Sequence, residues 1–381
     1  MTRYLIVGAG LTGDMAAKGI RDRDADGEIT IVGAEPDPTY RRPLLSKGLW
    51  SGAPEEKLWK QPAEGVELVT GRRIVSLDLE GRSARDDAGG EHAWDTLLLA
   101  TGARPREIPG ADGVIWFRTL ADYRALRERV REGSRVVVIG GGFIGSELAA
   151  ALHGNGVQVT MVFPEPGIGH RLFPAHLSDF VTGYYRERGV EVLTGETVES
   201  ASGTGVRLGS GRELEADAVV AGLGVVPNAD LAEASGLAVD NGIVVDQLGR
   251  AGGRDDVFAA GDVANFPLVA LGVSTRIEHE DHANSHGRAV GANMAGAETP
   301  YDHLPLFYSD LFDLGYEAVG LVDSRLDTVE RWDEPGRKGV VAYVDEERRP
   351  RGYLLWNVWD TVDAARELLK AGEPLGEAPG V

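Results

Sequence analysis

The chain has 381 residues, of which 43% are hydrophobic, 52 are Gly and none is Cys, and its formal net charge at pH 7 is -21. This length exceeds one ordinary core and predicts two or three domains. The absence of Cys excludes structural disulfides, thiolate metal sites and redox thiols, so electron chemistry requires a bound cofactor. The negative charge disfavours nucleic acids and anionic membranes as partners.

The first residues already form an apolar run, Arg3–Val7, which leaves no length for a signal or transit peptide. No apolar run approaches the length of a membrane span. We therefore expect a cytoplasmic protein without a membrane span. The eight His show no spacing typical of metal ligands, so we assign no metal site.

The first predicted unit is β-α-β. An apolar strand at Tyr4–Val7 leads into the turn Gly8–Gly13, a helix to about Ile20 follows, and a second strand covers Glu28–Val32. The turn has the pattern G-x-G-x-x-G, with Leu11 and Thr12 between its last two glycines. A strand before this pattern and a helix after it are typical of a dinucleotide-binding turn.

The same arrangement is repeated in the middle of the chain. A strand at Arg135–Ile139 precedes the turn Gly140–Gly145, a helix to about His153 and a strand at Gln158–Phe163. In each turn the first Gly allows a tight bend, the second lets a pyrophosphate approach, and the third lets the helix pack closely. Two such units predict two nucleotide-binding domains of similar topology, with the phosphates at the helix N-termini.

The rest of the chain predicts smaller sheets. Short alternating strands fill Gly71–Gly102 and Glu191–Gly224. Further strands are predicted at these positions: Ile243–Val245, Val257–Ala260, Glu317–Val322, Gly339–Val344 and Arg351–Trp356. A closing helix is expected over Asp360–Lys370, and the Gly-, Pro- and Glu-rich tail Gly372–Val381 is expected to be frayed.

A dinucleotide needs a hydrogen-bond acceptor for its ribose at the end of the second strand. In the first unit Glu35 follows Gly13 by 22 residues and fits this role. In the second unit Phe163 occupies the expected position, and Glu165 comes two residues later. Either Glu165 reaches the ribose or the choice between NADH and NADPH is loose, since His170 and Arg171 could favour a phosphate.

Several motifs together resemble one flavoprotein family. The two glycine turns, Ala100-Thr101-Gly102 and Gly261-Asp262 have the order seen in two-dinucleotide flavoprotein reductases, and 40–47 (YRRPLLSK) resembles the flavin segment of ferredoxin-reductase-like members. The later segments 276–283 (RIEHEDHA), 307–310 (FYSD), 315–324 (GYEAVGLVDS) and 354–357 (LLWN) resemble apoptosis-inducing factor. The resemblance covers nearly the whole chain and implies an FAD-dependent NAD(P)H oxidoreductase.

The expected fold is α/β, with two Rossmann-like domains and a small α+β C-terminal domain. The resemblance assigns FAD to residues 1–115 and 245–300, NAD(P)H to 116–244, and the C-terminal domain to 301–381. Relatives in animals carry a mitochondrial targeting region and a long insertion in the C-terminal domain, which would fall between about Thr328 and Lys338 here. A compact relative without these features is expected to be a redox enzyme, and the resemblance implies no role in cell death.

The resemblance also assigns roles to individual residues. Lys47 lies beside the flavin ring, where its charge stabilises the negative charge left by hydride addition, and Glu147 pairs with it and faces the nicotinamide. Phe143, His279 and Tyr308 are expected at the flavin. The remaining expected cofactor contacts are Gly8, Gly10, Leu11, Thr12, Gly13, Glu35, Arg42, Ala100, Thr101, Gly102, Arg106, Gly140, Gly142, Ile144, Gly145, Glu165, Gly224, Gly261, Asp262 and Glu278. Among these, Arg42 is assigned to the pyrophosphate and Asp262 to the ribityl chain.

Three functions remain open at this stage. The first is an apoptosis-inducing-factor-like enzyme that passes electrons from NADH through FAD to an acceptor such as a protein, a quinone or oxygen. The second is a reductase component for a ferredoxin or rubredoxin, which the net charge of -21 disfavours for an acidic partner. The third is a redox-switched scaffold with little turnover. The resemblance implies a homodimer of the reduced, NAD+-bound form, which the net charge of -21 opposes.

Overall fold

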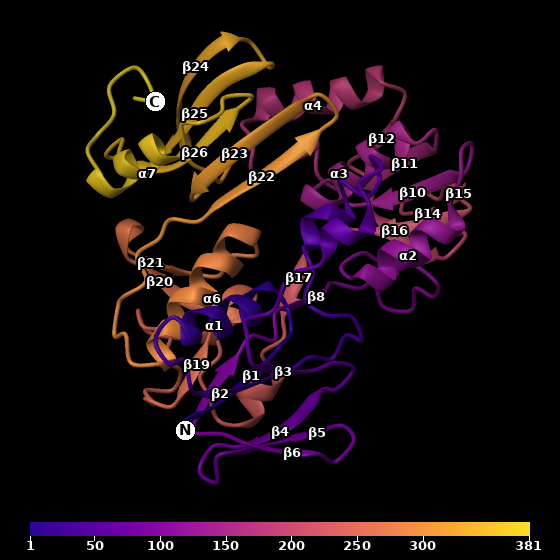
Figure 1. Cartoon of the computed structure of the whole chain (residues 1–381). Coiled ribbons are helices and arrows are strands. Elements are labelled where there is room, and N and C mark those ends of the chain that lie inside the picture. Colours follow the sequence, from indigo (N-terminus) through magenta and orange to yellow (C-terminus); the bar gives the residue numbers. More distant parts are fainter. The chain divides into compact units, whose positions relative to one another are not determined.

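The computed structural model describes residues 1–381, and the chain forms two compact units. Unit 1 comprises Met1–Arg41, Glu55–Arg104 and Val226–Pro305, and unit 2 comprises Arg42–Pro54, Pro105–Val225 and Leu306–Val381. Figure 1 shows the elements of both units in chain order. The division into three domains stays a prediction, and each unit is described by itself.

Unit 1 is built on a parallel five-stranded sheet with the order β19-β7-β1-β2-β3. Its strands are β1 (Arg3–Val7), β2 (Glu28–Val32), β3 (Val66–Val69), β7 (Thr96–Leu99) and β19 (Val257–Ala259). The central strands are continuous apolar runs because helices and loops bury both faces of a parallel sheet. The sequence predicted β1 and β2 with these bounds.

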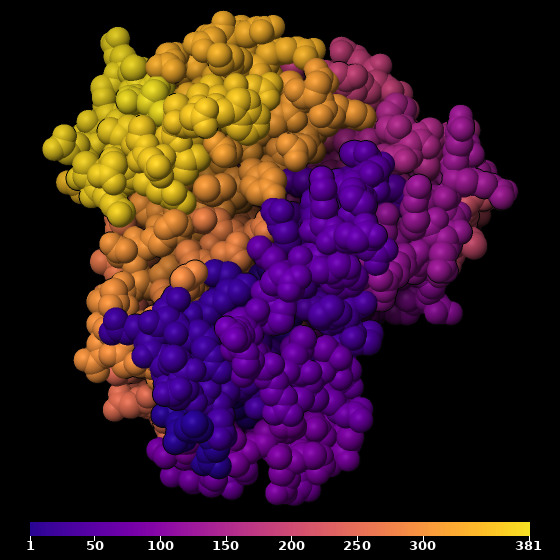
Figure 2. Space-filling model, in the orientation of Figure 1, coloured from indigo at the N-terminus to yellow at the C-terminus, as the bar shows by residue number.

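Two helices pack together against this sheet. They are α1 (Leu11–Arg21) and α6 (Glu280–Met294), and Figure 1 shows them next to each other. Their buried faces share a core that includes Ala16, Ile20 and Val290. In Figure 2 the orange surface of the later residues adjoins the indigo surface of the N-terminal ones. Segments far apart in the sequence therefore share one core in unit 1.

Smaller elements complete unit 1. In the sequence, the antiparallel sheet β4-β5-β6 lies between β3 and β7. The strands of the three-stranded sheet β18-β20-β21 lie on either side of β19. Their bounds, with those of the short helices, are β4 (Ile74–Asp78), β5 (Ser83–Asp86), β6 (Glu91–Ala93), β18 (Ile243–Val244), β20 (Ala264–Leu268), β21 (Val273–Thr275), η2 (Glu55–Leu58), α5 (Asp230–Ala234), η3 (Gly261–Val263) and η4 (Val269–Leu271). The short alternating strands predicted between Gly71 and Gly102 are present.

Unit 2 contains the second parallel sheet, with the order β12-β11-β10-β16-β9. Its strands are β9 (Ile115–Trp116), β10 (Arg135–Ile139), β11 (Gln158–Phe163), β12 (Glu191–Thr194) and β16 (Ala218–Ala221). The helices of this part are α2 (Leu120–Arg129), α3 (Phe143–Gly154) and α4 (Ala175–Glu187), and a small sheet is formed by β13 (Val198–Ser202), β14 (Gly205–Leu208) and β15 (Glu213–Glu215). The predicted β10, α3 and β11 agree with the structure.

The end of the chain forms an antiparallel sheet with the order β22-β23-β26-β25-β24, which also belongs to unit 2. Its elements are β22 (Leu306–Leu311), β23 (Leu314–Gly320), β24 (Asp327–Glu334), β25 (Lys338–Val344), β26 (Pro350–Trp356) and the helix α7 (Val362–Ala371). At the turn after β22, Phe312 packs on Tyr185 of α4, with ring centroids 4.9 Å apart. Contacts among Asp313, Tyr184 and Arg188 close the same junction.

The chain passes between the units at β8 (Ala103–Pro105) and β17 (Val225–Pro227), which form a two-stranded sheet. A short helix, η1 (Arg42–Leu45), starts the segment Arg42–Pro54 that belongs to unit 2. Segments of unit 1 and segments of unit 2 therefore alternate along the sequence.

The expectation of a frayed tail is wrong. The backbone N–H of Leu375 donates to the carbonyl of Arg348 at 2.9 Å, and the Tyr353 hydroxyl donates to the carbonyl of Pro379 at 3.0 Å. The side chain of Arg348 also reaches the carbonyls of this segment. The tail is held because it supplies backbone acceptors to side chains of the C-terminal sheet.

Candidate functional site

The first glycine turn lies between β1 and α1 in unit 1. An added Cβ at Gly13 would lie 2.1 Å from the carbonyl oxygen of Gly8, so only Gly lets the helix start this close to the turn. Gly10 is the N-cap of α1, carries no side-chain cap, and has open space where a Cβ would be. The first amides of the helix are therefore available to a phosphate, and the turn fits a dinucleotide.

Glu35 follows β2 and folds back beside this turn. The hydroxyl of Tyr40 donates to Glu35 Oε2 at 2.5 Å, and the hydroxyl of Thr39 donates to the carbonyl of Ala9 at 2.9 Å. These bonds place a carboxylate beside the glycine turn, at the carboxyl end of the strand. This position is compatible with the predicted role of Glu35 as a ribose acceptor, which stays a prediction.

The strands β7 and β19 end at the same edge of the sheet. Ala100-Thr101-Gly102 follows β7, and Gly261 follows β19 next to the side chain of Thr12, where an added Cβ would lie 2.2 Å from its Oγ1. The Thr101 hydroxyl donates to the carbonyl of Asn228 at 2.7 Å. In unit 1, the predicted Gly261 therefore lies against the glycine turn. The predicted Thr101 forms a hydrogen bond with the backbone of the same unit.

Arg276 is a buried residue of this region to which sequence reasoning gave no role. Its side chain is 8% exposed, its Nη1 donates to the carbonyl of Asp262 at 3.2 Å, and the same atom lies 2.5 Å from Glu278 Oε1. The residue fixes the turn that presents Asp262 and orients the predicted Glu278. It lies inside the RIEHEDHA motif, whose resemblance pointed to Glu278 and His279.

His279 is the N-cap of α6. Burial lowers the pKa of His279 to about 4, although the nearby carboxylates of Asp262 and Asp281 act in the opposite direction. The imidazole is therefore neutral at pH 7. A neutral ring suits a wall of a flavin site and does not supply a positive charge.

The second glycine turn, between β10 and α3 in unit 2, has the same construction. An added Cβ at Gly145 would lie 2.0 Å from the carbonyl oxygen of Gly140. Gly142 is the N-cap of α3, has no side-chain cap and has open space at its Cβ position. Ile144 is in the first turn of this helix. A second pyrophosphate therefore fits here on the same physical grounds.

Phe163, which occupies the expected ribose position of this unit, has a packing role. Its ring fills the space beside Gly141, where an added Cβ would lie 2.9 Å from the ring, and the residue is 1% exposed. Glu165 is the first carboxylate that remains accessible after β11, and its Oε1 pairs with Arg171 at 2.8 Å. The side chain of Arg171 is 85% exposed, so this pair is weak and open to exchange.

The ion pair expected between Lys47 and Glu147 is present. Lys47 Nζ lies 3.1 Å from Glu147 Oε1, with side chains 15% and 6% exposed. Longer contacts join the same ammonium to the carbonyl of Tyr308 at 3.4 Å and to Asp310 Oδ2 at 3.5 Å. A lysine and a carboxylate from segments 100 residues apart therefore meet at the start of α3.

Two of the aromatic residues expected at the flavin, Phe143 and Tyr308, belong to the same unit as this pair. The ammonium of Lys47 lies over the ring of Tyr308, 4.0 Å from its centroid. Phe143, the first residue of α3, packs edge-on against Phe307 with centroids 5.3 Å apart. Tyr308 is 37% exposed, so β22 presents an aromatic ring beside a cation at the surface of unit 2.

The remaining predicted contacts divide between the units. Arg42 donates to the carbonyl of Arg118 at 3.1 Å, and the backbone N–H of Arg106 donates to the carbonyl of Gly224 at 2.9 Å, all within unit 2. Unit 2 also holds Lys47, whereas the first glycine turn, Glu35 and Asp262 belong to unit 1. The predicted FAD contacts thus come from both units.

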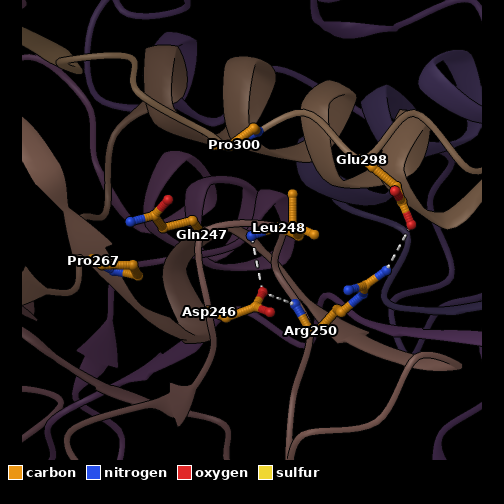
Figure 3. Close-up of a pocket in the computed structure, with 7 residues that line it drawn as sticks. All are labelled: Asp246, Gln247, Leu248, Arg250, Pro267, Glu298 and Pro300. Atoms are coloured by element: carbon orange, nitrogen blue, oxygen red, sulfur yellow. Dashed lines mark hydrogen bonds and ion pairs between the residues drawn. The ribbon is translucent and has the colours of Figure 1, made fainter.

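Figure 3 shows a pocket in unit 1 that contains none of the predicted residues. It is lined by Asp246, Gln247, Leu248, Arg250, Pro267, Glu298 and Pro300. Asp246 accepts from the backbone N–H groups of Leu248 and Arg250 at 2.8 and 2.9 Å, and Arg250 pairs with Glu298 at 3.5 Å. The polar groups of this pocket bond to the backbone of the local turn and to one another, so we assign the pocket no ligand.

No helix of the structure has both the length and the apolar composition that crossing a membrane requires. The family model described as pyridine nucleotide-disulphide oxidoreductase matches residues 2–287, and the C-terminal model of apoptosis-inducing factor matches residues 290–337. Together they span most of the chain.

Proteins similar to this chain along most of its length are known. Apoptosis-inducing factor 1 of Dictyostelium discoideum is 31% identical, covering 96% of this chain and 78% of that protein. The ferredoxin–NAD(+) reductase component of an anthranilate 1,2-dioxygenase system from Burkholderia cepacia is 36% identical, covering 97% and 94%. A solved complex of putidaredoxin reductase with putidaredoxin matches with a TM-score of 0.91 at 29% identity, covering 98% and 94%.

These matches confirm the α/β fold with two Rossmann-like domains and the resemblance stated from the motifs. The lack of Cys separates this chain from members that use a redox disulfide. The chain belongs to the pyridine nucleotide-disulphide oxidoreductase family and is an apoptosis-inducing-factor-like, FAD-dependent NAD(P)H oxidoreductase.

Proposed function

We propose that this enzyme takes hydride from NADH at the second glycine turn and uses Lys47 and Glu147 to support its transfer to FAD. The observation that carries the proposal is the buried pair of Lys47 with Glu147 of α3. Bound FAD would supply a ring that accepts the hydride. Lys47 would place a fixed cation where negative charge develops, and Glu147 would hold that cation in place.

The binding roles proposed for the other residues follow their positions. The amides at Gly10 and Gly142 would hold the two pyrophosphates, and Glu35 would accept hydrogen bonds from the FAD ribose. Asp262 would bind the ribityl chain, and Arg42 the FAD pyrophosphate. Phe143, His279 and Tyr308 would line the flavin.

Anaerobic titration with NADH tests the function. We expect one equivalent of NADH to bleach the flavin absorbance, with a long-wavelength band that persists when NAD+ stays bound to the reduced enzyme. A persistent band supports the apoptosis-inducing-factor-like function, and a band that decays rapidly supports a plain reductase. Flavin that remains oxidised under excess NADH and NADPH rejects the proposal.

A protein acceptor is the second candidate, favoured by similarity to reductases over nearly the whole chain. The net charge of -21 argues that such a partner is not strongly acidic, since like charges slow encounter. Steady-state reduction of a set of ferredoxins of different charge would identify the preferred class. The homodimer, the scaffold function, the absence of nucleic-acid partners and the cytoplasmic location stay predictions.

The flavin itself is the subject of a simple prediction. Denatured protein should release FAD and no FMN, because the first glycine turn and Glu35 bind the adenosine half of a dinucleotide. Chromatography of the released flavin measures this. FMN as the released species would mean that neither feature holds the cofactor.

NADH should be preferred to NADPH. The carboxylate of Glu165 accepts from a ribose diol and repels a 2'-phosphate. We expect Glu165→Gln to reduce the ratio of kcat/KM for NADH over NADPH about tenfold, because one charged hydrogen bond is lost. Glu187→Gln, at the end of α4, is the control. An unchanged ratio in Glu165→Gln would show that another group reads the ribose.

A further inference from the structure

The carboxylate of Glu147 receives hydrogen bonds from two buried serines as well as the ammonium of Lys47. The hydroxyl of Ser46 donates to Oε2 at 2.6 Å, and the hydroxyl of Ser309 donates to Oε1 at 2.6 Å. Lys47 Nζ lies 3.1 Å from the same Oε1. Ser46 is 3% exposed and Ser309 is 1% exposed. Each oxygen of a buried carboxylate therefore has its own hydroxyl donor.

The other titratable groups that face this carboxylate are neutral or negative. Burial raises the pKa of Tyr185 on α4 and of Tyr316 on β23 well above the usual range, and the charge of Glu147 acts in the same direction. Asp310 is near the same site, with its Oδ2 3.5 Å from the Lys47 ammonium. Charge on Glu147 is thus stabilised by Lys47 and by the hydroxyls of the two serines.

We propose that Ser46 and Ser309 are positioning residues for hydride transfer, which hold the Glu147 carboxylate in one orientation so that it fixes the Lys47 ammonium. The inference rests on the proposed function and adds two residues to it. Neither serine needs to touch the nicotinamide or the flavin.

The two serines have different tasks because they bind different oxygens. Ser309 shares Oε1 with Lys47, so its hydroxyl limits how strongly the carboxylate draws the ammonium toward itself. Ser46 binds Oε2 and fixes the plane of the carboxylate. Loss of Ser309 leaves Lys47 closer to Glu147, and loss of Ser46 leaves a buried carboxylate oxygen without that hydroxyl donor.

Through Ser309, the C-terminal sheet also supports the Glu147 carboxylate. Ser309 lies on β22, Ser46 follows η1, and Glu147 lies on α3, so three distant segments converge on one carboxylate. The turn after β22 is held on α4 by the contact between Phe312 and Tyr185. A shift of β22 would therefore move the hydroxyl that supports the Lys47–Glu147 pair.

Holoprotein carrying Ser46→Ala, Ser309→Ala or Ser309→Thr tests the inference. Two quantities are measured in each: the saturating rate and the apparent Kd of NADH in anaerobic flavin reduction, and the midpoint potential of bound FAD in a dye-linked titration without NADH. We expect the saturating rate to fall about tenfold in both alanine variants while the Kd of NADH stays unchanged, because one hydrogen bond to the buried carboxylate is lost. In Ser309→Ala the potential should fall, because a retracted ammonium stabilises reduced flavin less.

Ser134→Ala is the matched control, since Ser134 is also buried, in unit 2, and accepts a hydrogen bond from the N–H of Arg131 at 3.1 Å. It should change neither quantity, and Ser309→Thr, which keeps the hydroxyl, should restore both toward wild type. A weaker Kd of NADH with an unchanged saturating rate in both alanine variants would overturn the inference, as would an unchanged FAD potential in Ser309→Ala. Wild-type protein that NADH does not reduce would instead reject the proposed function, and the potential would still test Ser309.

Discussion

Lys47→Ala should slow flavin reduction by NADH about a hundredfold, since removing one fixed electrostatic stabiliser of a transition state typically has this effect. The FAD content should stay close to that of wild type, because the glycine turn, Glu35 and Asp262 of unit 1 are unchanged. Stopped-flow absorbance under anaerobic conditions measures the rate, and the absorbance ratio of flavin to protein measures the content. A large loss of reduction rate with little loss of FAD content would assign Lys47 to the chemical step.

Two further variants separate charge from packing. Lys47→Arg keeps a cation near Glu147 and should recover part of the lost rate. Lys338→Ala removes a lysine that is 53% exposed and 3.8 Å from Asp333, and it should leave the rate unaltered. Reduction of Lys47→Ala at the wild-type rate would contradict the role of Lys47, and a matching loss of FAD would show that the residue serves binding.

The nucleotide-binding parts of the fold could be predicted because their signals are local. The strand, the glycine turn and the helix follow one another directly, and the strands are apolar runs that need no partner to be recognised. The helix α2 was not predicted, although its buried residues Leu120, Tyr123 and Leu126 have helical spacing and Thr119 forms a capping box with Asp122. The strand β24 was missed because most of its residues are charged, and β22 was missed because a polar residue, Ser309, occupies one of its buried positions.

The pairing of Lys47 with Glu147 was available from the resemblance, whereas its supporting hydroxyls were not. Ser46 and Ser309 are separated from Glu147 by 101 and 162 residues, and a serine in a motif carries no sign of its partner. Arg276 was missed for the same reason, since its bond to the carbonyl of Asp262 depends on how β21 and η3 meet. Long-range contacts of polar side chains are fixed by packing and have no local pattern.

The histidines of unit 1 form a buried cluster that links pH to stability. The rings of His282 and His286 lie 4.7 Å apart, and Phe266 stacks on His282 with centroids 4.6 Å apart. The backbone N–H of Gly261 donates to His286 Nδ1 at 3.3 Å, so this ring is an acceptor and carries no proton there. Burial lowers the pKa of His286 to about 3 and that of His282 well below its usual range.

The sign of the pH effect follows from these directions. A histidine in the unfolded chain binds a proton below about pH 6.5, whereas the buried rings stay neutral, so the unfolded state binds more protons as the pH falls. The stability contributed by the cluster is present above pH 6.5 and is lost progressively toward pH 3. His286 alone, 1% exposed, should account for a loss of about 3 kcal/mol in the free energy of unfolding between pH 7 and pH 4.

Urea unfolding of the holoprotein at several pH values between 7 and 4, with a constant excess of FAD, measures this loss. Most carboxylates remain ionised above about pH 5, so the histidines dominate the slope from pH 7 down to about pH 5. His286→Asn keeps an acceptor for the Gly261 N–H but cannot titrate, and it should be less stable at pH 7 with a shallower pH dependence. His176→Asn is the control, because His176 is 56% exposed and should leave the slope unchanged. Equal slopes for wild type and His286→Asn would mean that His286 is protonated in the folded protein at acid pH and that the cluster opens before the chain unfolds.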